Sequence, residues 1–554
     1  MPRGRKGPPQ DSIDSILLAI SRRNDIDPTT MEYYFERLDE EWTDGARAKV
    51  LQLLRSSDVA AHSAAIHVLS ELATDYDLED LEDFVTDPTV SDMAKLTLAP
   101  ILKELGSEMA DEGIIEYLND PEAAMLQMQM RLLELVGQSE LGVEAVLEDV
   151  LAMPVERRMG FVDWLGRSHD PRAAHLLIPL LENQPGKLIM ATIDALEQLG
   201  TVAVQQTIPA LNYLLTTSSN RALKQHARAT LGRLTMLSAP GTEAAAMAEA
   251  AQQPLALYEA RVSFIDGSGA QIIMLSWRRP DGMLKGVNVL YQDQWGIKDC
   301  YGTDEMEEGR WSELVHEMEE QGFYSFQVPV EYCLALIAEA AALNKRTRHK
   351  VPIAYTVWRP LIGAEGVQHK GVSPVPTALA PCVFDDDLAS EAKRGAELYQ
   401  WLEFASWMFE PLTVLQPYIN RYWATYDLLE GPGSGRGRGR GRKGKQKEHQ
   451  ANLDTIVSEA LAELIDDRWR LLYEARLRRQ GQLFVCTERT AEATLISAVA
   501  AALHPDSALP PQEQAFLHAM MGLSIQQGPF RMMIEALDTD DFGALPIDLF
   551  PPKR

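Results

Sequence analysis

The sequence lacks the features by which disulfide-bonded, zinc-binding and membrane proteins are most easily recognised. Its 554 residues include four cysteines, which lie far apart and form no Cys-x-x-Cys pair. This spacing predicts neither a disulfide framework nor a thiolate zinc site, and it favours a reducing, cytoplasmic environment. No run of 18 apolar residues is present. We therefore expect no membrane-spanning segment and no membrane partner.

Motifs of common catalytic sites are also missing. The eleven histidines give no His-Glu-x-x-His pattern, and neither a Gly-x-Ser-x-Gly elbow nor a nucleotide-binding fingerprint is present. The turn-like Asp266-Gly-Ser-Gly lacks the lysine and the following helix of a phosphate-binding loop. We expect no metal and no cofactor. Catalytic groups that converge only in the fold would leave no motif, so an enzyme remains an alternative.

Basic residues are scarce and unevenly placed. The sequence holds 81 acidic and 52 basic residues, giving a formal net charge of −29. An acidic body of this kind repels nucleic acid on average. Any dense group of cations therefore stands out as a candidate contact for an anionic partner.

The first 235 residues contain a repeating pattern of paired helices. Similar segments follow one another in steps of 30 to 35 residues, starting near Asp58, Pro88, Pro121, Val155, Pro185 and Asn220. A period of this length is typical of a helical solenoid. A single helix pair cannot bury its own apolar face, so the stacked array is expected to fold as one unit and to present an extended binding surface.

Two stretches carry a family resemblance. Residues Ala191 to Gly200 and Gln225 to Leu234 each carry an alanine followed by Leu-x-x-Leu near the end of a second helix. With the leucine-rich first helices, they resemble the HEAT-repeat family over about residues 44–236. The arginine usual in the second helices is approached only by Arg228. The resemblance implies a curved α-solenoid used for binding or assembly; some HEAT-like proteins are bilin lyases. An irregular helical bundle without a groove is the alternative.

The middle of the chain changes to a period of two. Tyr258–Ile265, Gln271–Trp277, Leu284–Tyr291 and Trp295–Cys300 predict four strands joined by tight turns. Helices at Trp311–Gln321 and Val330–Leu343 and a further strand at Phe323–Val328 complete a small α+β domain with an antiparallel meander.

The predicted fold class is therefore mainly α, in five segments. We assign HEAT-like repeats to 12–240, the α+β domain to 255–385, aromatic-rich helices to 386–428, a disordered Gly/Arg/Lys linker to 429–450 and a C-terminal helical module to 451–540. Aromatic side chains at helical spacing favour a core for 386–428. A groove for a flat ligand or an apolar peptide is the alternative.

The linker concentrates positive charge, because seven cations fall within twelve residues. Its Gly-Arg alternation resembles RNA-binding arginine–glycine segments and predicts a polyanion contact. Three arginines in the following helix are candidates to support it. A tether that folds back on the acidic body is an equal alternative. The candidate nucleic-acid-binding residues are Arg436, Arg438, Arg440, Arg442, Lys443, Lys445, Lys447, Arg468, Arg476 and Arg479.

A second basic group follows the Val330–Leu343 helix. It forms a candidate phosphate or carboxylate site, and its alternative role is to complement the negative end of the helix. The candidate residues are Lys345, Arg346, Arg348, Lys350 and Arg359.

These features predict a non-catalytic adaptor that binds a protein partner on its solenoid surface. The first alternative is a protein that binds nucleic acid or another polyanion through the Gly/Arg linker. The second is an enzyme, for example lyase-like, that uses the α+β domain.

Overall fold

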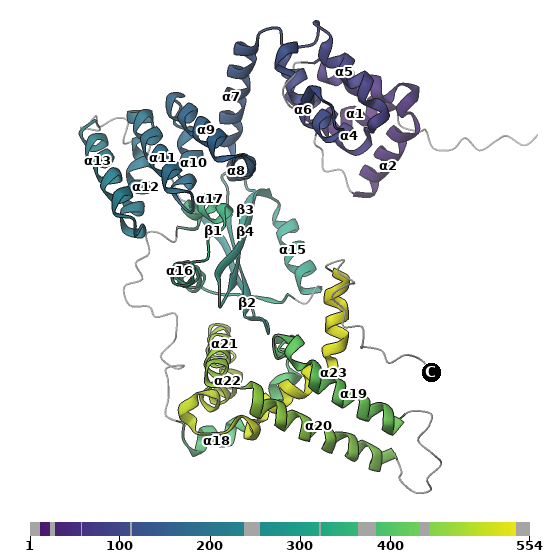
Figure 1. The fold of residues 1–554 in the computed structure, drawn as a ribbon, viewed down its shortest axis with the longest axis vertical. Coiled ribbons are helices and arrows are strands. Elements are labelled where there is room, and N and C mark those ends of the chain that lie inside the picture. The colour runs from purple at the N-terminus through teal and green to yellow at the C-terminus, as the bar shows by residue number, and fades with distance from the viewer. Residues whose placement is uncertain are drawn as a thin grey trace, which may run out of the picture. The chain divides into compact units, whose positions relative to one another are not determined.

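A computed structural model describes residues 12–22, 28–56, 58–110, 114–237, 255–320, 323–363, 384–430 and 442–538. Helices dominate these residues, together with one five-stranded antiparallel sheet (Figure 1). The mainly α fold with a small α+β part and a C-terminal helical module is therefore confirmed. The chain divides into two compact units, Met1–Leu135 and Val136–Arg554.

The first unit is all helical. Side-chain caps begin several of its helices: the Ser12 hydroxyl accepts from the Ser15 amide at 3.2 Å, and the Asp58 carboxylate accepts from the Ala60 amide at 2.9 Å. Leucine, isoleucine, valine and alanine side chains from these helices, except the short η2, form one core. The helices are α1 (Ile13–Ser21), α2 (Pro28–Glu40), η1 (Trp42–Ala46), α3 (Arg47–Leu54), α4 (Val59–Leu72), η2 (Asp75–Asp77), α5 (Leu78–Thr86), α6 (Asp92–Glu104) and η4 (Ile114–Tyr117).

The boundary between the units lies inside α7 (Pro121–Gln138), within the residues 12–240 that are predicted to form one repeat domain. The physical reason lies in α7, most of whose residues are exposed and bury little surface against neighbouring helices. The second unit begins with the remaining helix pairs. These are α8 (Glu140–Ala152), α9 (Val155–Arg167), α10 (Ala173–Leu177), η5 (Pro179–Leu181), α11 (Gly186–Leu199), η6 (Gly200–Val202), α12 (Val204–Thr217) and α13 (Arg221–Leu237).

The predicted antiparallel meander is present, with strand order β4-β3-β2-β1-β5. Asp266 and Gly282 lie in the turns that join its first strands, and the carboxylate of Asp266 accepts from the Ala270 amide at 2.8 Å. The fifth strand pairs with the first and completes the sheet. The strands are β1 (Ala256–Ser263), β2 (Ala270–Arg278), β3 (Leu284–Gln292), β4 (Gly296–Met306) and β5 (Ser325–Gln327).

Helices cover both faces of the sheet (Figure 1). On one face, Trp311 of α15 (Glu308–Glu320) packs over Gly286, where a Cβ atom would lie 3.2 Å from its ring. On the other, Trp358 of α17 (Ile353–Ile362) lies against Gly302, where a Cβ atom would overlap the indole. The indole N–H of Trp358 also donates to Glu144 of α8 at 2.8 Å, which joins the helix pairs to the sheet. The long α16 (Val330–Thr347) packs on the same sheet.

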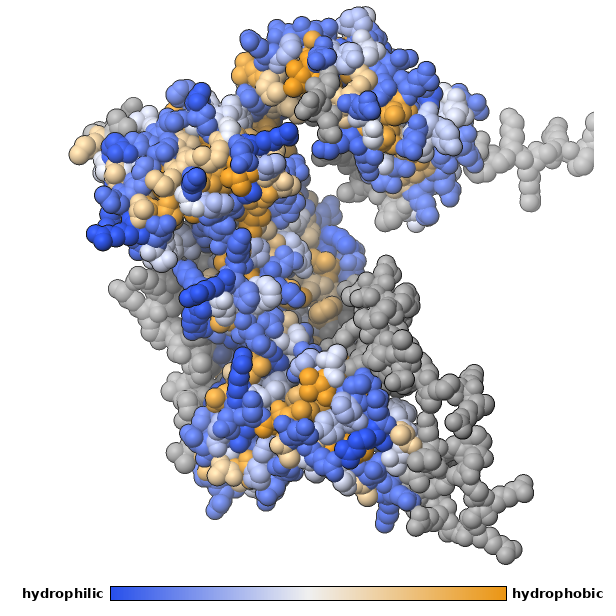
Figure 2. Space-filling model, viewed as in Figure 1, coloured by the Kyte–Doolittle hydropathy of each residue, from blue (hydrophilic) through white to orange (hydrophobic). Residues whose placement is uncertain are grey.

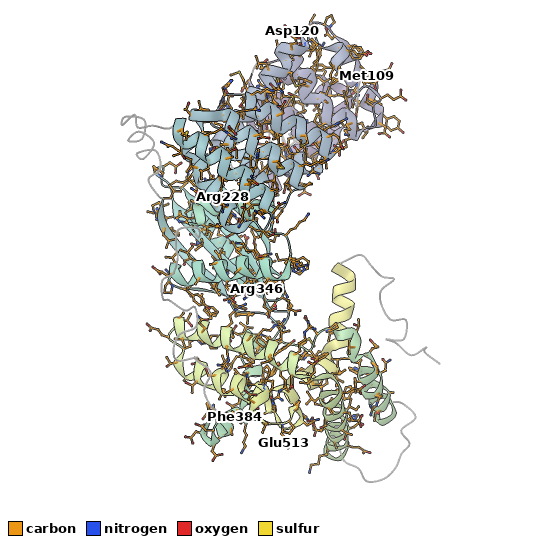
Figure 3. All side chains as sticks on the ribbon, turned by 60° about the vertical axis from the view of Figure 1, so that its left-hand side comes forward. Met109, Asp120, Arg228, Arg346, Phe384 and Glu513 are labelled. Atoms are coloured by element: carbon orange, nitrogen blue, oxygen red, sulfur yellow. The ribbon has the colours of Figure 1, made fainter. Side chains whose placement is uncertain are left out.

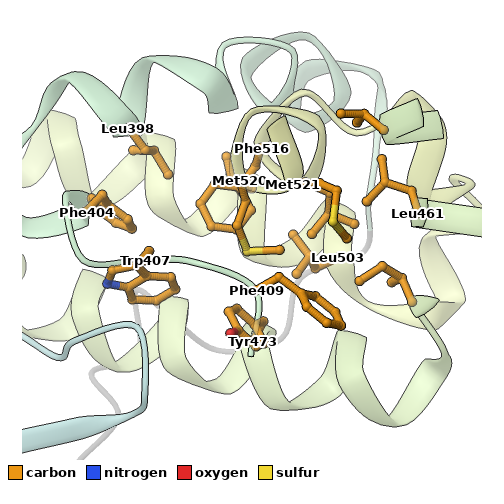
Figure 4. Close-up of a cluster of buried hydrophobic side chains, with 14 of the residues drawn as sticks. Leu398, Phe404, Trp407, Phe409, Leu461, Tyr473, Leu503, Phe516, Met520 and Met521 are labelled. Atoms are coloured by element: carbon orange, nitrogen blue, oxygen red, sulfur yellow. The ribbon is translucent and has the colours of Figure 1, made fainter. Parts of the chain in front are cut away.

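The C-terminal module has a single aromatic core, drawn in Figure 4. Phe404, Trp407 and Phe409 pack against Tyr473 and Phe516, so the predicted segments 386–428 and 451–540 form one folded body. The aromatic segment therefore serves as core. The elements are α18 (Asp386–Ala392), η8 (Gly395–Gln400), η9 (Leu402–Phe404), η10 (Leu412–Leu415), α19 (Gln416–Glu430), α20 (Arg442–Leu464), α21 (Asp467–Cys486), α22 (Thr490–Leu503), η11 (Pro505–Ser507), η12 (Pro511–Glu513) and α23 (Ala515–Asp538).

Candidate functional site

The structure describes only part of the predicted linker and of its cations. Arg436, Arg438 and Arg440 lie outside the described residues. The remaining four belong to the beginning of α20, which starts at Arg442, so residues 442–450 are helical where a disordered linker was predicted. An uninterrupted stretch without proline extends the helix back into the basic run. The four residues are Arg442, Lys443, Lys445 and Lys447, of which the last is exposed.

The three arginines of α21 have different environments. Arg468 is exposed, but Arg476 is buried, with only 3% of its surface accessible. The Arg476 guanidinium donates to Asp293 (Nε to Oδ2, 2.6 Å) and to the Ser268 carbonyl at 2.7 Å. Burial alone would lower the pKa of Arg476, but the hydrogen bonds and charge of Asp293 raise it. Arg476 therefore fixes two turns of the sheet to the C-terminal module and is not free to bind nucleic acid.

Arg479 has the same kind of role. Its guanidinium lies 2.6 Å from a carboxylate oxygen of Glu339 and 4.2 Å from the ring centroid of Tyr291. Both partners belong to the α+β domain, on α16 and β3. The prediction that Arg468, Arg476 and Arg479 form one nucleic-acid-binding face is therefore not supported for the last two, because each pairs with a carboxylate from a distant part of the chain, buried in Asp293 and partly exposed in Glu339.

In the second predicted basic group, one residue is separated from the other four. Arg359 on α17 is buried and pairs with Glu182 at 2.6 Å, and its guanidinium lies 4.3 Å from the Tyr213 ring centroid. It belongs to the contact between α17 and the helix pairs and does not join an anion site. The other four residues stay together at the end of α16 and are exposed; Figure 3 labels Arg346 on this helix. They are Lys345, Arg346, Arg348 and Lys350.

The described residues contain two hollows with polar groups. The larger, of about 1040 Å³, lies among α20, α21 and the segment Phe409–Thr413 and includes the exposed Arg468. The smaller, of about 410 Å³, lies between β1 and α15. In the smaller hollow Glu259 accepts from Trp311 Nε1 at 2.7 Å and pairs with Arg261 at 2.8 Å. The Glu259 carboxylate is therefore held by a tryptophan N–H and an arginine.

The next features are the buried cysteines and the possible metal ligands of the described ranges. Burial raises the pKa of the Cys300 and Cys333 thiols, which keeps them protonated and weakly nucleophilic. No group of three or more histidine, cysteine, aspartate or glutamate side chains in those ranges is placed to hold a metal ion. Among the described helices, none is both long enough and apolar enough to cross a membrane.

The sequence analysis missed an apolar surface on α7. Five large apolar side chains are exposed on this helix between residues 125 and 135, with 42% to 60% of each surface accessible. Single exposed apolar residues are ordinary, but such a cluster is typical of an interaction site. The sequence contained evidence of this surface, because three methionines fall within six residues. At that spacing they occupy more than one face of the helix, whereas a helix that packs on a core needs apolar residues on one face only. The five are Met125, Leu126, Met128, Met130 and Leu135.

On the face drawn in Figure 2, hydrophilic residues predominate, and apolar residues gather in patches over the helix pairs and the C-terminal module. Comparisons with known proteins add no assignment: the chain matches no protein-family model, no curated protein and no solved structure.

Proposed function

We propose that this protein is a non-catalytic scaffold that binds a partner protein through α7. The observation that carries the proposal is the cluster of exposed apolar side chains on this helix. Met125, Met128 and Leu135 of this cluster follow, with the partly buried Leu132, the spacing i, i+3, i+7 and i+10, which places the four on one face. Methionine side chains are flexible and adapt to varied apolar surfaces, so they suit a docking helix.

The charges around this face indicate the chemistry of the partner. Glu116, Glu122 and Glu134 are exposed before and along α7. On α7, Glu122 lies beside Leu126 and Glu134 beside Met130, so a partner segment that covers these apolar residues would place its own flanking side chains near the carboxylates. An amphipathic helix with an apolar stripe bordered by lysine or arginine fits both features.

The test uses the full-length chain and a defined probe. The probe is a fluorescent 20-residue peptide of leucine and lysine with an amphipathic helical pattern, and a peptide of the same composition in scrambled order is its control. The α7 variant carries Met125→Gln, Met128→Gln and Leu135→Gln. The matched control variant carries Met190→Gln, Val202→Gln and Met236→Gln, which alter exposed apolar residues of α11, η6 and α13.

We expect the patterned peptide to bind the unaltered chain, and the α7 variant to bind it at least tenfold more weakly in fluorescence anisotropy. A tenfold loss corresponds to about 1.4 kcal/mol, which is less than the burial of one large apolar side chain supplies. The control variant should bind as the unaltered chain does. Equal binding of the scrambled peptide, or an unchanged affinity of the α7 variant, would refute the proposal. Proteins captured by the unaltered chain but lost from the α7 variant would then identify the natural partner.

A further inference from the structure

The hairpin between β3 and β4 presents an aromatic ring to solvent. The structure describes all ten tryptophans, and Trp295 is the only one of them that is exposed, with 42% of its surface accessible. One face of its indole stacks on the His349 ring, with the ring centroids 3.9 Å apart and the planes inclined by 12°. Burying a tryptophan is strongly favourable, so an exposed one held by a single stacking partner suggests a contact for a ligand.

The surrounding backbone holds this ring in place. The Thr347 hydroxyl donates to the Trp295 carbonyl at 3.1 Å. Asn344 exchanges two hydrogen bonds with Ile297, at 2.7 and 3.1 Å. Gly296 has φ +109°, and a Cβ atom there would overlap Asn344, so only glycine fits the turn. The aromatic pair is therefore fixed before any ligand arrives.

Unpaired cations lie close to His349 in sequence, at the end of α16 and in the segment that follows it. Arg346, Arg348 and Lys350 are exposed, and within the described chain none of them forms an ion pair. Three nearby carboxylates do not neutralise these cations, because each is paired with a different arginine. They are Asp293, Glu339 and Glu182, bound to Arg476, Arg479 and Arg359. The end of α16 is thus locally positive in a chain whose net charge is −29.

We propose that the Trp295–His349 stack and the cations Arg346, Arg348 and Lys350 form a binding site for single-stranded nucleic acid. The free face of the indole stacks on a base, and the cations contact the phosphates on either side of it. Single strands fit because their bases are accessible, whereas the bases of a duplex are stacked on one another. Gln294, beside Trp295, lines the larger hollow together with Arg468, which gives the strand a second polar contact. The site is independent of the surface proposed on α7.

The test measures binding of a fluorescein-labelled 12-nucleotide oligothymidylate to the full-length chain. Inorganic polyphosphate serves as a probe that carries phosphates without bases. The stacking variant is Trp295→Ala, with Phe323→Ala, also exposed at 47%, as its matched control. Trp295→Phe retains a stacking face. The charge variant is Arg346→Gln with Lys350→Gln, and its control is Lys187→Gln with Lys393→Gln, which are exposed lysines of α11 and the segment after α18.

We expect Trp295→Ala to weaken oligothymidylate binding about tenfold, as the loss of one stacked base predicts, and Trp295→Phe to recover most of it. The charge variant should lower the slope of log affinity against log salt by about 1.4, which is 0.7 for each lost phosphate contact. Polyphosphate should bind more weakly and should not respond to Trp295→Ala. Both control variants should bind as the unaltered chain does.

A further variant separates this site from the basic run of the sequence. It replaces Arg436, Arg438, Arg440, Arg442, Lys443, Lys445 and Lys447 with glutamine. The dependence on Trp295 should persist in this background. Unchanged binding by Trp295→Ala, or equal loss of polyphosphate and oligothymidylate, would overturn the proposal. Retained far-ultraviolet circular dichroism and an unchanged thermal unfolding midpoint in each variant show that the fold is intact.

Discussion

The arginines of α21 and the cations at the end of α16 carry the same charge but have opposite environments. Arg476 is almost fully buried against Asp293, and Arg479 lies against Glu339. Arg346 and Arg348 are exposed and form no ion pair among the described residues. The difference lies in the carboxylates that the fold brings to each place. In an acidic chain, a cation is available to a partner only where the fold leaves it without a carboxylate.

This comparison predicts the largest effect for Arg476. Arg476→Ala leaves the buried carboxylate of Asp293 without its partner and frees two turns of the sheet from the C-terminal module. We expect the free energy of unfolding to fall by about 3–5 kcal/mol, the range for breaking one side of a buried ion pair. Chemical denaturation followed by circular dichroism measures it.

Arg468 is the matched control on the same helix. Arg468→Ala removes an exposed side chain, and we expect a change within about 0.5 kcal/mol. Equal effects of the two substitutions would contradict the assignment of Arg476 as a structural residue.

Arg359 should have the second largest effect. Its ion pair with Glu182 is less deeply buried than that of Arg476, because 18% of the Glu182 side chain is accessible. Arg359→Ala should therefore cost about 1–3 kcal/mol, mainly by leaving this carboxylate partly desolvated without a partner. Thermal unfolding measures the loss. A variant with Glu182→Gln added should recover part of it, and no recovery would show that lost packing on Tyr213 dominates.

The cations at the end of α16 should contribute least. Arg346→Gln with Lys350→Gln breaks no ion pair among the described residues, so we expect stability to change by less than about 0.5 kcal/mol. The same chain should nonetheless show the altered salt dependence of oligothymidylate binding. A large loss of stability would show that Arg346 and Lys350 are structural residues, as Arg476 is. The proposed site requires the opposite, that these cations are free to bind a ligand.

The elements of the fold could be predicted to a large extent because their signals are local. Alternating apolar residues and Asp-Gly turns identified the meander, and the pairs Val204–Thr217 and Arg221–Leu237 follow the predicted repeat. The division within α7 was not predicted, because the helical pattern continues through it while the packing does not. The shared core of the aromatic segment and the C-terminal module was also missed, since it depends on contacts between distant residues such as Trp407 and Phe516.

The candidate sites were harder to predict for the same reason. Arg476 and Asp293 are 183 positions apart in sequence, so no local pattern indicates that they pair. The run Lys345 to Lys350 was recognisable because its cations are adjacent. Its aromatic component was not, since Trp295 reaches His349 only through the packing of the β3–β4 hairpin on α16.

The carboxylate of Glu144 reverses the comparison, because an acid here has other acids as neighbours. Burial raises its pKa, the N–H of Trp358 opposes the rise, and the charges of Glu148, Asp299 and Asp304 add to it. A raised pKa means that the folded state binds the proton more tightly than the unfolded state. The resulting stability is fully present below the ordinary glutamate pKa and is lost as the pH rises through the folded value.

Glu144→Gln keeps an oxygen that accepts from Trp358 Nε1 but cannot ionise. We therefore expect the variant to match the unaltered chain near pH 4 and to become more stable at pH 7, by less than about 1 kcal/mol, since water screens a half-buried group. Thermal unfolding at the two pH values measures this difference. The exposed Glu148→Gln, on the same helix, should show a smaller effect. The opposite result would be a Glu144→Gln variant that equals the unaltered chain at pH 4 but is less stable than it at pH 7. It would mean that ionised Glu144 strengthens the junction between α8 and α17.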